Sequence, residues 1–387
     1  MKRKNLLLLL LIIFAIVLIG LVAYGVLRTP NSTPNPQFTQ LNSVHAVRID
    51  YLDISNSQTE LDGLESQMKA AGTNMVALSA GRVDWTYFPW KGHPDRWSSE
   101  VKRTGVDYLA RDSARFSEWA HVSAVVDMLA PRYLKSRPDE AAISSTGIAS
   151  DNLVSTVDLV EGDFGQDALD MIEFIAANYP VNSVTISELV YYVDGFGDND
   201  KAAYTSYSGQ EDWPRTATGE IDIDDPSIGT WRAYEVGRFL EKAAEIVHRY
   251  DKQLFFEARV SLDSNGNVVV KNGTDLDAYL MDADRLVVWG NHDLDGQPVE
   301  AISQVASYLT QFGVERVIMM IGLWDNIYSP DFPKEQMTAI PAANLQVMLE
   351  STEQAGITNQ WVSPSFLISQ EHWNSINAVW MSNPTPP

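Results

Sequence analysis

LDMIEFIAANYPVNSVTISELVYY, residues 169–192, contains the pattern that decides the fold. Leu169, Ile172 and Ile175 recur at helical spacing, so the first half predicts a helix with one apolar face. Asn178–Pro180 then connects this helix to Ser183–Val190, a run rich in Val, Ile and Leu that is typical of a strand covered on both faces. A helix packed on a buried parallel strand is the repeating unit of α/β proteins.

The same alternation recurs over most of the chain. Eight apolar runs predict strands at His45–Leu52, Asn74–Ser79, Val122–Leu129, Ser183–Val190, Leu254–Val260, Arg285–Trp289, Arg316–Ile321 and Asn359–Ser363. The stretches between them carry apolar residues at helical spacing, for example Ile302, Val305 and Leu309. This succession of β–α units predicts an α/β fold, a (β/α)8 TIM barrel, whose usual size is about 250 residues plus insertions.

An open, doubly wound sheet is the alternative arrangement of such units. Sheets of that kind normally have a glycine-rich phosphate-binding turn after the first strand. Asp53–Ser57 occupies this position and contains no glycine. We therefore expect the closed barrel.

The connections between the predicted elements differ in length according to their direction. Strand-to-helix connections are long and rich in Trp, Tyr, Asp and Arg, as in Gly81–Gly105, Pro131–Gly165 and Val193–Ser227. Helix-to-strand connections are short, as at Gly72–Thr73 and Asp251–Lys252. In a parallel barrel all strand-to-helix connections gather at one mouth, where active sites are built. The sequence therefore predicts a functional site at that mouth.

Composition excludes several classes of function. The chain has 387 residues, of which 45% are hydrophobic, so it can bury one large core. A net charge of −23 without a basic stripe opposes nucleic-acid binding. The absence of cysteine excludes disulfides and thiolate metal sites. The six histidines lack the close spacing of a helical zinc motif, so we expect no metal site. No organic cofactor is implied.

The N-terminus predicts attachment to a membrane. Lys2, Arg3 and Lys4 precede Leu6–Leu27, an uncharged apolar span that is long enough to cross a bilayer, for which about 20 residues are needed. Positive charge stays on the cytoplasmic side, so a single-pass anchor would place the barrel outside the cell. A cleaved signal peptide and a secreted domain are the alternative.

These observations divide the chain into four segments. A Pro-, Asn- and Thr-rich stretch follows the apolar span, and a similar short stretch ends the chain. The predicted organisation is a transmembrane anchor or uncleaved signal at 1–28, a disordered linker at 29–43, the barrel at 44–381 and a disordered tail at 382–387.

Glu188 is the first candidate for a catalytic residue. It follows Ser187 at the end of the fourth predicted strand, which would place its carboxyl at the barrel mouth. Burial without partners is costly for a carboxylate and raises its pKa, which suits a general acid. A carboxylate that caps a loop or pairs with an arginine is the structural alternative.

Glycoside hydrolysis typically uses two carboxyl groups, so a second is expected on a neighbouring strand. Asp127 ends the third predicted strand, and Glu257 lies in the fifth. Either could serve as nucleophile or as the base that activates water. The structural alternatives are an ion pair of Glu257 with Arg259, and an ion pair of Asp127 with Arg132 or Arg82.

Aromatic and polar residues at the predicted mouth would bind a sugar ligand. Flat apolar rings offer a stacking surface to sugar CH faces, whereas Asp, Asn, Arg and His bind hydroxyl groups. Packing in the core or at the rim is the alternative for each ring. The candidate substrate-binding residues are Asp50, Arg82, Asp84, Trp85, Tyr191, Tyr192, Trp289, Asn291, His292, Asp293, Trp324 and Trp361.

The stretch around Glu188 resembles a group of glycoside-hydrolase TIM barrels that includes family-10-like hydrolases and the barrel of exported poly-N-acetylglucosamine hydrolases. In that group a Tyr-Pro-Val-Asp-Gly-Ile strand ends in Asp or in an Asp-Glu pair. Here Tyr179–Val181 matches, Asn182–Ser183 replaces Asp-Gly, and Ser187 stands before Glu188 where an Asp is usual. Thr156–Leu159 is also similar to the group. The resemblance implies a glycan-hydrolysing barrel with a catalytic carboxyl at Glu188.

The sequence thus predicts an exported, membrane-tethered barrel that hydrolyses a polysaccharide or glycan. Glu188 would act as general acid, with Asp127 or Glu257 as its partner. A non-catalytic carbohydrate-binding barrel is one alternative, favoured by Ser187 and by the absence of Glu at the end of the seventh predicted strand. A structural protein of the cell surface is another, because fold does not determine function.

Overall fold

The computed structural model describes residues 41–51, 57–262, 268–269, 274–290, 299, 301–325 and 337–382. The predicted anchor, most of the predicted linker and nearly all of the tail lie outside these ranges. No helix within them combines the length and the apolar character needed to span a bilayer.

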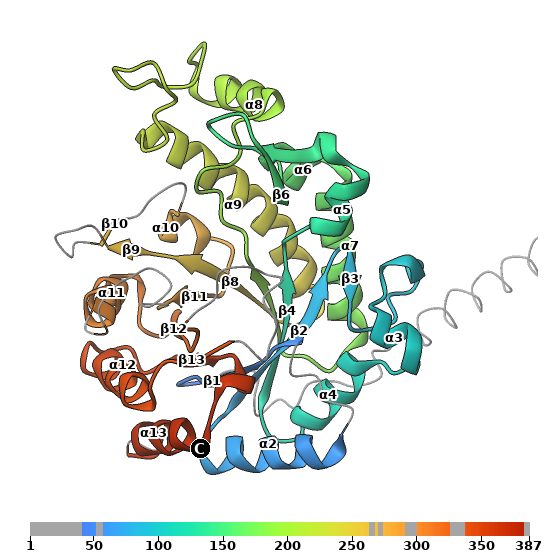
Figure 1. Cartoon of the computed structure of the whole chain (residues 1–387), viewed down its shortest axis with the longest axis vertical. Coiled ribbons are helices and arrows are strands. Elements are labelled where there is room, and N and C mark those ends of the chain that lie inside the picture. Colours follow the sequence, from blue (N-terminus) through green and yellow to red (C-terminus); the bar gives the residue numbers. More distant parts are fainter. Residues whose placement is uncertain are drawn as a thin grey trace, which may run out of the picture.

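Eight parallel strands form a closed barrel in the centre of the molecule (Figure 1). Each predicted strand overlaps an observed one: β1 (His45–Ile49), β2 (Met75–Arg82), β4 (His121–Asp127), β7 (Ser183–Ser187), β8 (Gln253–Arg259), β11 (Arg285–Trp289), β12 (Val317–Gly322) and β13 (Gln360–Ser363). The strands pair in chain order, and β1 pairs with both β2 and β13, which closes the ring. The predicted TIM barrel is confirmed, and the open doubly wound sheet is excluded.

A helix follows each strand and covers the outside of the barrel (Figure 1). These helices are α2 (Gln58–Ala70), α4 (Tyr108–Phe116), α7 (Asp163–Asn178), α9 (Pro226–His248), α10 (Leu276–Tyr279), α11 (Ala301–Leu309), α12 (Ala342–Gln354) and α13 (Gln370–Trp380). Side chains at several N-termini accept otherwise unpaired backbone N–H groups, for example Ser57 at α2 and Asp225 at α9. Pro226 occupies the first turn of α9, where its missing N–H costs nothing.

The long strand-to-helix connections contain structure of their own. The connection after β2 holds β3 (Trp85–Thr86), η3 (Pro94–Arg96) and α3 (Ser99–Thr104). The connection after β4 holds α5 (Pro131–Ser136), η4 (Pro138–Glu140), β5 (Ala141–Ile143), β6 (Ala149–Val154) and α6 (Thr156–Glu161). α8 (Asp198–Ser208) follows β7, and β9 (Ser261–Leu262) and β10 (Val268–Val269) follow β8. Two short turns, η5 (Thr310–Phe312) and η7 (Ser365–Leu367), complete the described elements.

Alternation along the strands divides the core into two layers. Ala46, Phe255 and Val287 point into the barrel and belong to one buried apolar cluster. Their neighbours Val47 and Phe256 point outward and join the larger cluster between strands and helices. Because the side-chain period of a strand is two residues, each inward position is separated from the next by one outward residue.

The barrel interior changes from apolar to polar near the carboxyl ends of the strands. Arg48 comes two residues after Ala46, and Glu257 comes two residues after Phe255. The same spacing separates Asp127 from Val125, which also belongs to the interior cluster. Strand alternation therefore aims these charged side chains into the mouth of the barrel, above a sealed apolar floor.

Candidate active site

Glu257 lies at the centre of a buried network at the mouth. Its Oε1 is 3.3 Å from Nη1 of Arg48, and its Oε2 accepts hydrogen bonds from Ser187 Oγ at 2.7 Å and Trp289 Nε1 at 3.0 Å. The side chain of Glu257 has 0% of its surface exposed, and that of Arg48 has 7%. A buried carboxylate needs such compensation, because an unpaired buried charge is very costly.

Arg48 extends this network to the first two strands. Its Nε lies 3.7 Å from Oδ2 of Asp50 and 3.4 Å from the Ser79 hydroxyl, to which it donates. Burial opposes the charge of Arg48, but the surrounding carboxylates, Glu257 first among them, raise its pKa above the ordinary value. The predicted ligand contact Asp50 is buried beside Arg48, and its Oδ1 has no hydrogen-bond partner in the described part of the chain.

The alternative pairing considered for Glu257 is wrong. Arg259 points to the same side of β8 but pairs with Glu188, at 3.7 Å between Nη2 and Oε2. The guanidinium of Arg259 also lies over the Trp289 ring, 3.9 Å from its centre. Since Arg48 instead neutralises Glu257, Arg259 remains 44% exposed at the mouth.

Asp127 is the last residue of β4 and lies in register with Ser187 of the adjacent β7. Its Oδ1 accepts the backbone N–H of Leu129 at 2.8 Å. No ion pair of Asp127 is found among the described residues, so the proposed pairing with Arg132 or Arg82 does not form within 4 Å. The side chain is partly exposed, in contrast with Glu257.

Glu188 reaches the mouth through an unusual backbone conformation. Ser187 points inward, so strict alternation would direct the next side chain outward. Glu188 instead has a φ of 62°, in the left-handed region that non-glycine residues rarely adopt, and the strand ends there. Its carboxyl then lies beside the inward-facing Arg259 with 28% of the side chain exposed. Strain of this kind is often retained at functional sites.

The charge of Glu188 acts on Asp127, which ends the adjacent strand. Removal from bulk water, followed by the charge of Glu188, raises the pKa of Asp127 to about 8. Removal from bulk water also raises the pKa of Glu188 to about 6, against the opposing effect of Arg259. Near neutral pH Asp127 is therefore largely protonated and Glu188 largely ionised.

The predicted substrate contacts after β2 are Arg82, Asp84 and Trp85, and they differ in burial. Asp84 is buried, and its Oδ2 accepts the backbone N–H groups of Arg132 and Tyr133 at 2.7 and 3.0 Å. These bonds anchor the first turn of α5, which is a structural role. Arg82 lies 3.3 Å from Asp84, and Trp85 remains partly exposed with the Arg82 guanidinium 5.5 Å from its ring centre.

A narrow recess separates β1, β2 and β4 at the mouth. The space between the described residues that line it is about 200 Å³ including its opening to solvent, and no part of it is wide enough to hold a water molecule. Its walls are formed by Arg48, Tyr51, Ser79, Gly81, Arg82, Trp85, Val125 and Asp127. The recess is therefore too narrow for a ligand to reach Asp127 through it.

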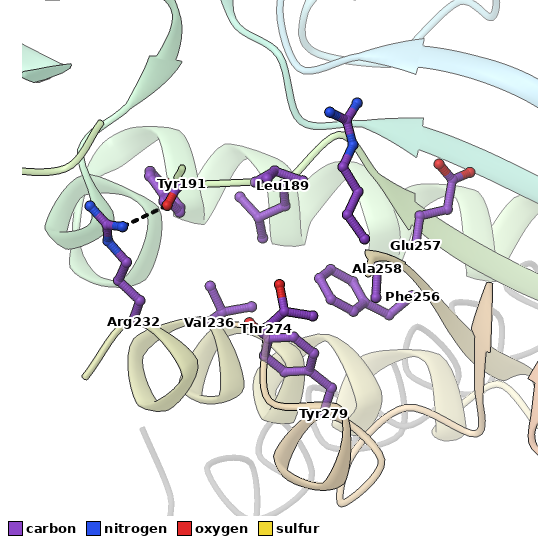
Figure 2. Close-up of a pocket in the computed structure, with 11 residues that line it drawn as sticks. Leu189, Tyr191, Arg232, Val236, Phe256, Glu257, Ala258, Thr274 and Tyr279 are labelled. Carbon is purple, nitrogen blue, oxygen red and sulfur yellow. Dashed lines mark hydrogen bonds between the residues drawn. The ribbon is translucent and has the colours of Figure 1, made fainter. Parts of the chain in front are cut away.

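The loop that carries Glu188 is held from outside by α9. Arg232, which is 1% exposed, donates from Nη1 to the carbonyl oxygens of Tyr191 at 2.7 Å and Tyr192 at 3.3 Å, and from Nη2 to that of Asp194. Figure 2 shows the bond to Tyr191 beside a cavity of about 20 Å³, roughly the space of one water molecule. Arg232 thus fixes the path of the chain just beyond the candidate site.

Figure 2 also shows how alternation separates the two sides of β8. Phe256 points toward the small cavity, whereas the Glu257 carboxylate points away from it. Tyr191 is buried, and its hydroxyl donates to the carbonyl of Val154 at 3.1 Å. Its burial leaves little of it for a ligand to contact, whereas Tyr192 is 45% exposed at the rim.

The remaining predicted contacts differ in accessibility. Trp361 is fully buried inside the barrel, so it contributes to the core and presents no surface to a ligand. Trp324 is partly exposed just after β12. Asn291, His292 and Asp293 lie outside the described residues.

Three contributors to the site escaped sequence reasoning: Arg48, Arg232 and the hydrogen-bonding role of Ser187. Arg48 has a local signal, because it is a charged residue at an inward position of the first predicted strand. Arg232 has none, because an arginine in the middle of a helix ordinarily points into solvent.

Within the described residues no group of three or more His, Asp or Glu side chains is arranged to hold a metal ion.

No protein-family model and no curated protein sequence matches this chain. Solved structures nevertheless share its architecture. The glycoside hydrolase domain of PgaB (BpsB) from Bordetella bronchiseptica aligns with a TM-score of 0.65 over 87% of this chain and 98% of that one, at 17% identity. The catalytic domain of β-amylase from Paenibacillus polymyxa aligns at 0.60 over 90% and 100%, at 11% identity.

A GH42 β-galactosidase from G. stearothermophilus is a third similar structure, with a TM-score of 0.59 over 88% of this chain and 57% of that one, at 10% identity. The predicted resemblance to glycoside-hydrolase TIM barrels is confirmed at the level of the fold. Sequence identities this low carry the fold and leave activity to be argued from the site.

Proposed function

We propose that this protein is a glycoside hydrolase acting on a polysaccharide or glycan, with Asp127 and Glu188 as its catalytic carboxyl groups. The observation that carries the proposal is the contrast at the mouth between these two partly exposed carboxyls, on adjacent strands, and the fully paired Glu257. Glycosidases use a pair of carboxyl groups on either side of the scissile bond. The glycoside-hydrolase fold of the similar structures supports this assignment.

The difference in pKa suggests the division of labour. Asp127, with a pKa of about 8, keeps its proton near neutral pH and can donate it to the glycosidic oxygen as the bond to the leaving group breaks. Glu188, with a pKa of about 6 beside Arg259, is then ionised and stabilises or attacks the positively charged sugar carbon, or activates water. These roles reverse the assignment of Glu188 as general acid made from sequence.

Glu257 is assigned a positioning role in this proposal. Its oxygens are occupied by Arg48, Ser187 and Trp289, so it cannot reach a substrate without breaking the network. Trp289, held by Glu257, presents its ring below Arg259 at the rim. Together with Trp85, Tyr192 and Trp324, it would bind the glycan.

The location proposed for this activity is the outer face of a membrane, with the N-terminal span as anchor and the N-terminus in the cytoplasm. Secretion after cleavage of the span is the alternative. Both place the barrel where polysaccharides of a cell wall or matrix are found.

The experiment that tests the proposal measures release of reducing ends. The full-length protein, Asp127→Asn and Glu188→Gln would be incubated with a β-1,6-linked N-acetylglucosamine polymer, soluble starch and galactan. We expect one polymer to be hydrolysed and each variant to lose about 1000-fold or more in rate, because a proton donor or a nucleophile is missing. Circular dichroism would verify that both variants fold. Equal rates for wild type and variants would refute the assignment.

A non-catalytic carbohydrate-binding barrel is the second candidate. It is favoured by Ser187 and by the recess beside Asp127, which has no room for a free water among the described residues. In that case the wild-type protein and both variants would bind the same polymer equally and release no reducing ends.

A further inference from the structure

A second, larger groove lies outside the barrel mouth. It is formed by α6, α8 and α9 and has a volume of about 590 Å³. Figure 1 shows α8 and α6 flanking the first half of α9. Ligand sites in proteins commonly have volumes of about 300–1,000 Å³. None of the residues that form this groove belongs to the recess beside Asp127.

Two exposed aromatic rings lie in this groove. Tyr207 of α8 and Tyr234 of α9 are 43% and 48% exposed, and their ring centres are 4.8 Å apart at an interplanar angle of 29°. Most other rings near these helices are buried, including Tyr204 and Trp231. Adjacent exposed rings form an apolar surface that remains in water unless a ligand covers it.

Charged groups border the rings in a fixed arrangement. Arg238 donates to Glu161 of α6 and to Glu235 of α9, both at 2.8 Å, and its guanidinium lies 5.9 Å from the centre of the Tyr234 ring. The pairing neutralises much of the local charge and holds polar groups beside the apolar rings. Flat rings bordered by fixed hydrogen-bonding groups match a sugar, which presents CH groups on its faces and hydroxyls at its edges.

Chain topology connects this groove to the candidate site. α6 belongs to the connection after β4, and α8 to the connection after β7. These are the strands whose ends carry Asp127 and Glu188. The exposed Tyr192 and Val193 lie on the path from Glu188 to α8. The connections after β4 and β7 are both strand-to-helix connections, so the groove lies toward the same end of the barrel as the mouth.

We propose that the groove between α6, α8 and α9 binds a distal part of the glycan chain whose scissile bond lies at the mouth. The inference rests on the proposed function and extends it to the substrate, which must be a polymer rather than a short oligosaccharide. Tyr207 and Tyr234, whose rings are stacked on one another, present their exposed surface to the CH groups of the sugars, and Arg238 with Glu161 and Glu235 contacts the sugar hydroxyls. The groove would keep a long chain on the enzyme between successive cleavages.

The test compares long and short chains. Full-length Glu188→Gln protein would be run in affinity electrophoresis through gels containing each of the three polymers named above, alone and with Tyr207→Ala/Tyr234→Ala. We expect the double change to weaken retention by one polymer about tenfold, since two stacking rings are lost. In the otherwise wild-type protein, the same change should lower the rate on that polymer while leaving the rate on its trimer within about twofold.

Two controls isolate the rings. Tyr207→Phe/Tyr234→Phe keeps both rings and should retain most of the polymer binding. Met281→Ala removes another exposed apolar side chain, 83% accessible, and should change nothing. A proline-rich peptide is offered as a competing probe, because aromatic grooves also bind extended peptides.

The outcomes separate this inference from the proposed function. If hydrolysis depends on Glu188 but polymer binding is unaffected by the tyrosine changes, the proposed glycan-binding groove is wrong and the proposed hydrolase function stands. If polymer binding depends on the tyrosines but no hydrolysis occurs, the groove binds the glycan and the proposed hydrolase function is wrong. Tyrosine-dependent binding of the peptide alone, or no binding of any probe, would overturn the groove.

Discussion

The two sides of the barrel mouth hold carboxyl groups in opposite states. On the closed side, Glu257 has no exposed surface and three partners, the nearest being the Ser187 hydroxyl at 2.7 Å. On the open side, Glu188 is 28% exposed, and its nearest cation, Arg259, is 3.7 Å away. Asp127, next to it, has no ion pair among the described residues. A fully paired carboxylate is held in place by its partners, whereas burial without full compensation raises the pKa of Asp127 and Glu188 and leaves them able to exchange a proton.

This contrast explains why counting acidic residues at strand ends is insufficient to find a catalytic pair. Asp127 and Glu257 have equivalent positions relative to Glu188 in the sequence pattern, one on each neighbouring strand. The difference between them arises from Arg48, which comes from β1 on the other side of the barrel interior and reaches only Glu257 closely. The Glu257 network and the pair Asp127 and Glu188 can therefore be tested separately.

The largest expected effect on stability comes from breaking the closed side. Glu257→Ala would leave Arg48 buried without its main counter-charge, and the free energy of unfolding should fall by about 3–5 kcal/mol. Unfolding in urea, followed by circular dichroism, measures this loss. The double variant Arg48→Met/Glu257→Leu removes both charges and should be more stable than Glu257→Ala. If the single variant were as stable as wild type, the network would not support the site.

A smaller effect on stability, of opposite sign, is expected when Asp127 is changed. The pKa of Asp127 is about 8 in the folded protein and about 4 in an unfolded chain, so the folded state holds the proton between these values. Stability should therefore fall as the pH rises from about 4 to 8. Asp127→Asn cannot ionise and should be more stable than wild type at pH 8, by on the order of 1 kcal/mol.

The advantage of Asp127→Asn should disappear toward pH 4, where the wild-type carboxyl is protonated in both states. Urea unfolding at several pH values measures the difference. Asp151→Asn, which changes an exposed carboxyl, controls for the loss of one negative charge. A variant that is less stable than wild type at pH 8 would contradict a costly ionised form of Asp127.

The smallest expected effect is on the pH dependence of activity, which Asp127 and Glu188 set together. The activity of the wild-type enzyme should fall below about pH 6, as Glu188 gains a proton, and above about pH 8, as Asp127 loses one. The charge of Arg259 lowers the pKa of Glu188, so Arg259→Gln should move the acidic limb to higher pH, by about half a unit. Rates of sugar release across this range measure the shift, with the exposed Arg249→Gln as control. A shift to lower pH would show that Arg259 does not act on Glu188.

Local patterns in the chain predicted most of the architecture. Helical spacing and apolar runs depend on neighbouring residues, and they identified all eight barrel strands and the direction of the long connections. They also placed Asp127, Glu188 and Glu257 near one another, because all parallel strand ends meet at one edge of a barrel. Trp361 was predicted to contact a ligand at the mouth, but it is in register with Ala46 in the apolar layer of the barrel interior, so its depth along the strand was mispredicted.

The pairing of charges could not be predicted in the same way. Arg259 shares an inward position with Glu257 on β8, which made it the obvious partner, yet Glu257 binds Arg48 from a strand that is distant in the sequence. Glu188 faces the mouth only because its backbone takes a left-handed conformation at the strand end.

The amino-acid sequence was thus sufficient to predict the barrel fold, the end of the barrel that carries the candidate site and the candidate acidic residues. These follow from hydrophobic periodicity and from the geometry common to all parallel barrels. Which acid is neutralised and which stays reactive emerged only when the ring of strands closed. Closure brings Arg48 of β1 to within 3.3 Å of Glu257 on β8. In the buried interior the interaction of two charges depends strongly on their distance, so Glu257 is neutralised by Arg48 whereas Asp127 is not.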